Sequence, residues 1–366
     1  MRHGPLVDCD VHQEISDPDD EIFPYLASGW QEFVLSRPGR MSVVPGVATY
    51  THNPFGYDRK DAQPPGGGKA GSSRELMVEQ LLDPYEVQAA ILTGGEVELG
   101  VSGINNPYFA AEVARAVNDR QIEHWLDWDP RFKGSVMLAL QVPDWAATEI
   151  RRLAGHSGIV QACASTNPLP FPFGHPIYDP VHRACAETGL PLAIHTLGDG
   201  YAGALGAPLA GGLPTLYLEF HTGAAQAVLT HLMSFIFHGV FDRYPTFKLA
   251  LLESGVGWIP STVRRMDENF KGLRREVPWC KRLPSEHFME RVLVSTQPLD
   301  ADPDDALIHA LGAVGAEGVL AFASDYPHWD TDVPTRTISV LPERWRDRVL
   351  RENATRFYGL TAAVPA

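Results

Sequence analysis

Short apolar runs rich in β-branched residues recur along the whole chain, and segments with a helical pattern separate them. Buried parallel strands have this composition, because helices cover the sheet that they form. Eight strand-then-helix units predict an α/β fold, a (β/α)8 TIM barrel with a long insertion after the first strand. The expected strands are Leu6–His12, Val87–Thr93, Gly134–Leu140, Gly158–Cys163, Pro191–Thr196, Phe247–Glu253, Arg291–Thr296 and Val319–Ser324.

An open doubly wound sheet is the alternative architecture for such a chain. That fold usually carries a glycine-rich phosphate-binding turn after its first strand. Here Asp10-Val11-His12 ends the first strand, so the sequence favours the closed barrel. The expected helices are Ser73–Leu82, Phe109–Trp128, Asp144–Ala154, Asp179–Glu187, His221–Phe241, Trp258–Leu273, Asp304–Val314 and a closing helix near Glu343–Tyr358.

Three segments exceed what a minimal barrel needs, within what we expect to be a single barrel domain over residues 1–366. Residues 13–72 are rich in proline and glycine, and we expect an inserted loop or arm that covers the site or packs on a partner subunit. Leu197–Pro214 is glycine-rich and follows the fifth strand, where barrels place active-site loops. Lys271–Glu290 carries the densest basic cluster.

Composition and charge exclude several classes of partner. Hydrophobic residues make up 44% of the 366 residues and the formal net charge is −15, so we expect a packed core and a surface that repels nucleic acid and anionic lipid. The sequence has no apolar run long enough to span a membrane, and its N-terminus lacks the features of a signal peptide. Its 4 cysteines are scattered without a metal-binding or disulfide spacing. We therefore expect a cytoplasmic protein with a small-molecule substrate.

Two histidines and two carboxylates stand at the ends of predicted strands. Asp10 and His12 end the first strand, two residues apart, so their side chains share one face. His195 ends the fifth strand, and Asp325 follows the eighth. Each residue alone could be a turn cap or a satisfied core residue, but together they occupy the rim where barrel enzymes carry their active sites. A set of imidazole and carboxylate ligands suits a divalent metal ion.

Several longer motifs resemble the amidohydrolase superfamily. They are Gly239–Lys248, Glu253–Pro260 and Ser324–His328, and the likeness extends from the first strand to Glu352–Tyr358. The pattern is similar to the amidohydrolase 2 branch, which includes aminocarboxymuconate-semialdehyde decarboxylase and related aromatic acid decarboxylases. The resemblance implies a barrel enzyme with Asp10, His12, His195 and Asp325 as metal ligands, and a homodimer.

Three departures from the superfamily pattern bear on the chemistry. Asp10 replaces the first histidine of the usual His-x-His motif, as an acid does in the aromatic acid decarboxylases. Gln161 stands in the fourth strand and no lysine ends that strand, so one metal ion is expected and no carboxylated-lysine bridge. Glu253 ends the sixth strand where many relatives have a histidine. The acid/base role of that histidine could therefore fall to Glu253 itself, or to His221, His238 or His328.

Other side chains could serve either structure or function. Glu14 is interpreted as a loop carboxylate, with contact to metal or substrate as the alternative. We expect the side chains of Arg274 and Arg275 to be exposed to solvent. The alternative is that they bind a substrate carboxylate, which arginine can do with two parallel hydrogen bonds. We expect three large aromatic residues in the core: Trp258, Trp279 and Phe288. The alternative is that they stack on an aromatic substrate.

These residues support two enzymatic hypotheses. The first is hydrolysis of a C–N or C–O bond in an amide or lactone by metal-activated water, with Asp325 moving protons. The alternative is non-oxidative decarboxylation of an aromatic or unsaturated carboxylic acid. We expect one divalent ion, Zn²⁺ before Mn²⁺ or Fe²⁺. A catalytically inactive binding barrel is disfavoured because all four expected ligands are present.

Overall fold

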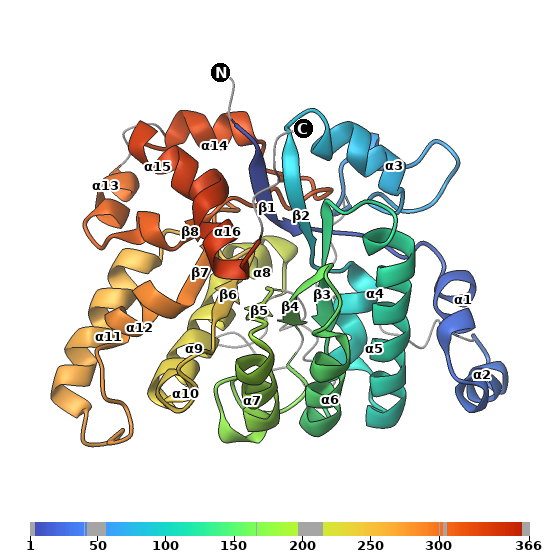
Figure 1. The fold of residues 1–366 in the computed structure, drawn as a ribbon, viewed down its shortest axis with the longest axis horizontal. Coiled ribbons are helices and arrows are strands. Elements are labelled where there is room, and N and C mark those ends of the chain that lie inside the picture. Colours follow the sequence, from blue (N-terminus) through green and yellow to red (C-terminus); the bar gives the residue numbers. More distant parts are fainter. Residues whose placement is uncertain are drawn as a thin grey trace.

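The structure is a computed structural model that describes residues 4–39, 41, 56–165, 167–196, 215–299, 301–302 and 306–360. Eight parallel strands pair in sequence order, each with the next, in a single sheet (Figure 1). They are β1 (Leu6–Val11), β2 (Val87–Leu92), β3 (Phe132–Met137), β4 (Ile159–Ala164), β5 (Leu192–Ile194), β6 (Leu249–Leu251), β7 (Val292–Ser295) and β8 (Leu320–Ala321).

The first and last strands also meet, which brings the sheet close to a closed barrel. Cys9 N–H donates to Phe322 O at 3.0 Å, and Asp325 N–H donates to Asp10 O at 3.0 Å. Val11 forms a parallel bridge with Tyr326 just beyond β8. The predicted (β/α)8 barrel is confirmed, and each observed strand overlaps the strand expected from sequence.

Helices surround the strands on the outside (Figure 1). Their apolar faces pack on the outward residues of the strands, such as Leu192, Leu249 and Val294, in one large core. The helices are α1 (Pro18–Glu21), α2 (Ser28–Leu35), α3 (Arg74–Met77), α4 (Glu96–Leu99), α5 (Pro107–Gln121), α6 (Pro143–Leu153), α7 (Asp179–Thr188), α8 (Tyr217–Gly223), α9 (Ala225–Phe237), α10 (Val240–Arg243), α11 (Ile259–Leu273), α12 (Pro284–Arg291), α13 (Ala306–Gly312), α14 (Pro334–Val340), α15 (Glu343–Asp347) and α16 (Asn353–Tyr358).

The helix expected over His221–Phe241 is three helices in the structure. His221 lies inside α8, and His238 ends α9 as its C-terminal cap. Gly239 then adopts a φ of 67°, in the left-handed region that glycine tolerates best. This turn ends the helical path and starts α10.

The insertion after β1 is partly helical and packs on the barrel. Ile22, Leu26 and Val34 are buried in one cluster with Val113 and Val117 of α5. Residues 40 and 42–55 of this arm, and the glycine-rich segment 197–214, lie outside the described residues. The homodimer and the arm's contact with a partner subunit remain predictions. None of the described helices is long and apolar enough to cross a membrane.

Candidate active site

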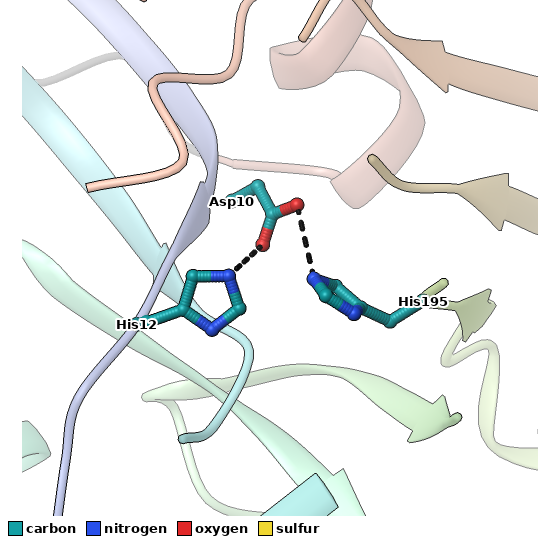
Figure 2. A group of neighbouring side chains, drawn as sticks. All are labelled: Asp10, His12 and His195. Atoms are coloured by element: carbon teal, nitrogen blue, oxygen red, sulfur yellow. Dashed lines mark ion pairs between the residues drawn. The ribbon is translucent and has the colours of Figure 1, made fainter. Parts of the chain in front are cut away.

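The expected metal ligands meet at the carboxyl ends of three strands. Asp10 and His12 come from the end of β1, and His195 follows β5. His12 Nε2 lies 3.6 Å from Asp10 Oδ1, and His195 Nε2 lies 3.5 Å from Asp10 Oδ2 (Figure 2). Asp325, which follows β8, places Oδ1 2.9 Å from His12 Nε2. All four side chains are buried.

Neighbouring groups fix the orientation of Asp10 and His12. Thr93 Oγ1 donates to Asp10 Oδ1 at 2.5 Å. The distance from His12 Nδ1 to Gly94 O is also 2.5 Å, and since a carbonyl oxygen only accepts, Nδ1 carries the proton. With Nδ1 fixed on this carbonyl, His12 Nε2 points toward Asp10 (Figure 2) and also lies near Asp325.

Four buried atoms of this cluster lack the hydrogen bonds that buried polar atoms normally make. Within the described part of the chain, Asp10 Oδ2, His12 Nε2 and both ring nitrogens of His195 have no hydrogen-bond partner. Side-chain atoms of Asp10, His12 and His195 lie within 4.8 Å of one another, as do those of His12, Asp325 and His328. Orphaned nitrogen and oxygen atoms that converge on one point fit a divalent cation.

Asp325 is held tightly at the point where β8 ends. Its backbone has a φ of 59°, which is unusual for a residue other than glycine and is common at functional sites. Gln297 Nε2 donates to Oδ2 at 3.1 Å, and His328 Nδ1 lies 2.7 Å from Oδ1. Burial opposes ionisation, but His328 and His12 outweigh it and hold the pKa of Asp325 well below its usual range.

Glu253 occupies the equivalent position at the end of β6. Its φ of 47° is again in the left-handed region. Glu253 Oε2 accepts a hydrogen bond from Thr196 Oγ1 at 2.9 Å and lies 3.3 Å from His195 Nε2. Burial, reinforced by the charge of Asp325, raises the pKa of Glu253. The structure thus brings this carboxyl group to the cluster.

A cavity of about 220 Å³ opens above these residues. His12, Glu253 and His328 line it, whereas Asp10, His195 and Asp325 are not among the residues of its wall. His221 also lines it, with its Nε2 3.3 Å from Asp330 Oδ2. Aromatic residues supply much of the remaining wall: Tyr57, Tyr217, Phe220 and Trp329. The cavity combines a polar end with broad apolar surfaces, as expected for a small organic ligand.

The structure separates the remaining candidates. His238 packs near His175, with ring centroids 5.5 Å apart, and is not among the residues that line the cavity. Arg274 and Arg275 are exposed at the end of α11. Trp279 is 48% exposed, so its placement in the core was wrong; its indole instead donates to a backbone carbonyl of α9.

The remaining positions agree with the sequence to different degrees. Phe288 is fully buried, as expected, and Trp258 is half-buried. Glu14, interpreted mainly as a loop carboxylate, is buried and lines the cavity. Burial raises its pKa to about 8 against the lowering effect of Lys69. Thr93 and Gln297 hold the candidate ligands but carried no sequence signal, because threonine and glutamine are ordinary residues at strand ends.

Comparison with known proteins supports one family. The amidohydrolase family model matches residues 7–360, and the chain belongs to this family, in the branch that the motifs predicted. A gamma-resorcylate decarboxylase from Polaromonas sp. strain JS666 is 25% identical over 269 residues, which cover 69% of this chain and 77% of that protein.

Solved structures show that the fold is shared with known enzymes. A 2,6-dihydroxybenzoate decarboxylase complexed with 2,6-dihydroxybenzoate has a TM-score of 0.66 at 19% identity, covering 97% of this chain and 99% of that chain. A 5-carboxyvanillate decarboxylase from Novosphingobium aromaticivorans, solved with bound manganese, has a TM-score of 0.64 at 19% identity and covers 97% of both chains.

The expectation that hydrolysis is the main activity was wrong. Its relatives by sequence include gamma-resorcylate and aminocarboxymuconate-semialdehyde decarboxylases, and the similar solved structures include decarboxylases of dihydroxybenzoate and 5-carboxyvanillate; these enzymes are carboxy-lyases and not hydrolases. The physical reason is that a barrel with these metal-binding residues does not itself specify the reaction. The same cluster can serve attack by water or proton transfer to a substrate carbon.

Proposed function

We propose that this protein is a metal-dependent, non-oxidative decarboxylase of a hydroxylated aromatic carboxylic acid. The observation that carries the proposal is the convergence of Asp10 Oδ2, His12 Nε2 and His195 Nε2, all without hydrogen-bond partners among the described residues, next to an aromatic-lined cavity whose wall includes His12. The decarboxylases among its relatives support the choice of reaction.

Asp10, His12, His195 and Asp325 would hold one divalent ion. Their nitrogen and oxygen atoms suit Zn²⁺ or Mn²⁺. The manganese in the 5-carboxyvanillate decarboxylase structure favours Mn²⁺ over the Zn²⁺ expected from the ligand set alone. When bound, such an ion supplies positive charge that attracts the carboxylate and an adjacent oxygen of the acid.

Glu253 is the residue best placed to act on the substrate as an acid. Non-oxidative decarboxylation adds a proton to the ring carbon that bears the carboxylate. The bond between the ring and the carboxyl carbon then breaks, its electrons restore the aromatic ring, and CO₂ leaves. The Glu253 carboxyl group faces the cavity, and Thr196 fixes one of its oxygens. We propose that it delivers this proton.

The surrounding side chains orient the reactants and limit water. His328 holds Asp325 through a contact of 2.7 Å and itself lines the cavity. His221, paired with Asp330, also lines the cavity, next to Trp329. The aromatic side chains offer flat surfaces that pack on a substrate ring and exclude water from the protonated carbon.

The proposal is tested by incubating metal-loaded protein with a panel of hydroxybenzoic acids. We expect release of CO₂ together with an equal amount of the corresponding phenol for at least one acid, and no release after treatment with a chelator. Failure of fully metal-loaded protein to release CO₂ from any member of the panel would reject the proposal.

A further inference from the structure

The wall of the cavity formed by the arm contains a second polar cluster. Glu14 lies just after β1, Lys69 belongs to the arm, and Glu96 begins α4; all three line the cavity. Lys69 Nζ lies 2.7 Å from Glu96 Oε2 and 3.6 Å from Glu14 Oε2. We call Glu14, Lys69 and Glu96 the arm cluster.

Glu14 is fixed in place but leaves one oxygen without a hydrogen bond. The residue is only 5% exposed. Glu14 Oε1 accepts a hydrogen bond from the backbone N–H of Glu96 at 3.1 Å. Glu14 Oε2 accepts none from the described residues, although it is buried. A buried oxygen without a partner in a cavity wall is favourable only if a ligand or water completes its hydrogen bonding.

Gly95 shows that the backbone is shaped around this carboxyl group. A Cβ atom at Gly95 would collide with the carboxyl carbon of Glu14 and with the carbonyl oxygen of Gln13. Only glycine allows the loop after β2 to approach so closely. The arrangement is therefore a built site and not a loose surface carboxylate.

The charge around the arm cluster disfavours a second anion. The ammonium group of Lys69 is already engaged by Glu96, and Asp58 adds a further carboxyl group to the same cavity. A second ring carboxylate placed next to the arm cluster would be repelled by these acidic groups, because Lys69 is already paired with Glu96. A hydroxyl group carries no charge and can form a hydrogen bond with Glu14 in either protonation form of that residue.

We propose that Glu14 is a specificity-determining residue that hydrogen-bonds a ring hydroxyl group of the substrate, and that the arm cluster rejects substrates with a second carboxylate. This inference rests on the proposed function. It assigns to this cavity hydroxybenzoic acids with one carboxylate and a hydroxyl group beyond the one adjacent to that carboxylate. Dicarboxylates, such as a carboxyvanillate, would be excluded.

The test measures equilibrium binding by calorimetry to manganese-loaded protein that carries Glu253→Gln, so that turnover contributes little heat. The ligands are salicylate, the dihydroxybenzoates that add one ring hydroxyl, and hydroxyisophthalates that add a carboxylate instead. We expect at least one dihydroxybenzoate to bind roughly tenfold more tightly than salicylate, and the hydroxyisophthalates to bind more weakly than salicylate.

Variants assign the preference to Glu14. Glu14→Leu should remove the roughly tenfold preference, whereas Glu14→Gln, which keeps polar atoms at the same place, should retain most of it. Asp61→Asn, an exposed change on the same arm, serves as the control and should leave all affinities unchanged. Metal content is measured for every variant, so that a lost ion is not mistaken for a lost subsite.

The outcomes separate the two proposals. A preference that persists in Glu14→Leu, or tight binding of the hydroxyisophthalates, would overturn the role of Glu14 even if CO₂ is released. A preference that depends on Glu14 without CO₂ release from any ligand would support the subsite and reject decarboxylation.

Discussion

The buried carboxylate of Asp8 accepts a hydrogen bond from the backbone N–H of Ser324 at 2.9 Å. The same oxygen accepts from the backbone N–H of Asp10 at 3.3 Å, where the pairing of β1 with β2 shifts register. Asp10 is a candidate metal ligand, and so is Asp325, the residue that follows Ser324. One carboxyl group thus joins the first strand to the end of the last beside the proposed metal site.

We expect Asp8→Ala to weaken metal binding on the order of tenfold. The change removes the oxygen that accepts from the backbone N–H groups of Asp10 and Ser324, and so loosens the backbone at the two ligands Asp10 and Asp325. Asp8→Asn keeps an accepting oxygen and should bind metal nearly as well as the wild type. Asn353→Ala is the matched control, since Asn353 Nδ2 donates to Leu320 O at 2.8 Å at the other end of β8. It should lower stability by about 1–3 kcal/mol without changing metal affinity. Equal affinities in Asp8→Ala and the wild type, measured by chelator competition, would contradict the positioning role.

His195→Ala should empty the metal site, because it removes a buried nitrogen that faces Asp10. His238→Ala should keep full metal content, because His238 lies outside the cavity lining. Elemental analysis of both purified variants checks the pair. Retention of metal in His195→Ala would remove this histidine from the proposed ligand set.

Glu253→Gln should lower kcat by roughly 10²–10⁴-fold, as expected for loss of a general acid. Metal content should not change, and KM should change much less than kcat, because the amide fills the same space. Steady-state rates of CO₂ release provide the measurement. Near-normal turnover in this variant would assign proton delivery to another residue.

Two buried histidines away from the site predict how stability depends on pH. Burial lowers the pKa of His182 to about 4 and that of His231 to about 3. The unfolded chain binds these protons near its ordinary pKa of about 6.5, whereas the folded protein does not. The free energy of unfolding should therefore fall as pH drops from about 6.5 toward 4. Each histidine contributes about 1.4 kcal/mol to this loss for every tenfold difference in proton affinity between the unfolded and folded states.

Urea unfolding followed between neutral pH and pH 5 tests this dependence on the two histidines. His182→Gln removes one of the depressed groups and should flatten the decline in stability. A decline as steep in the variant as in the wild type would show that other groups cause it.

The sequence located the strands well because each is a short apolar run, but it could not reveal contacts between distant segments. His12, His195 and Asp325 were predictable as neighbours, since barrel strands end on a common rim. Lys69 was not, because the sequence predicts an arm that covers the site or packs on a partner subunit but does not indicate which of its residues reaches the cavity. The burial of Glu14 depends on Gly95, more than eighty residues further along, and no local pattern encodes that approach.

Titration of metal-free protein with Mn²⁺, with CO₂ release from a hydroxybenzoic acid as the readout, tests the central claim most directly. We predict no release without metal and a rise that reaches its plateau at about one equivalent, as expected for one ion held by Asp10, His12, His195 and Asp325. Release that is already complete without metal, or none at any metal concentration, would contradict a metal-dependent decarboxylase.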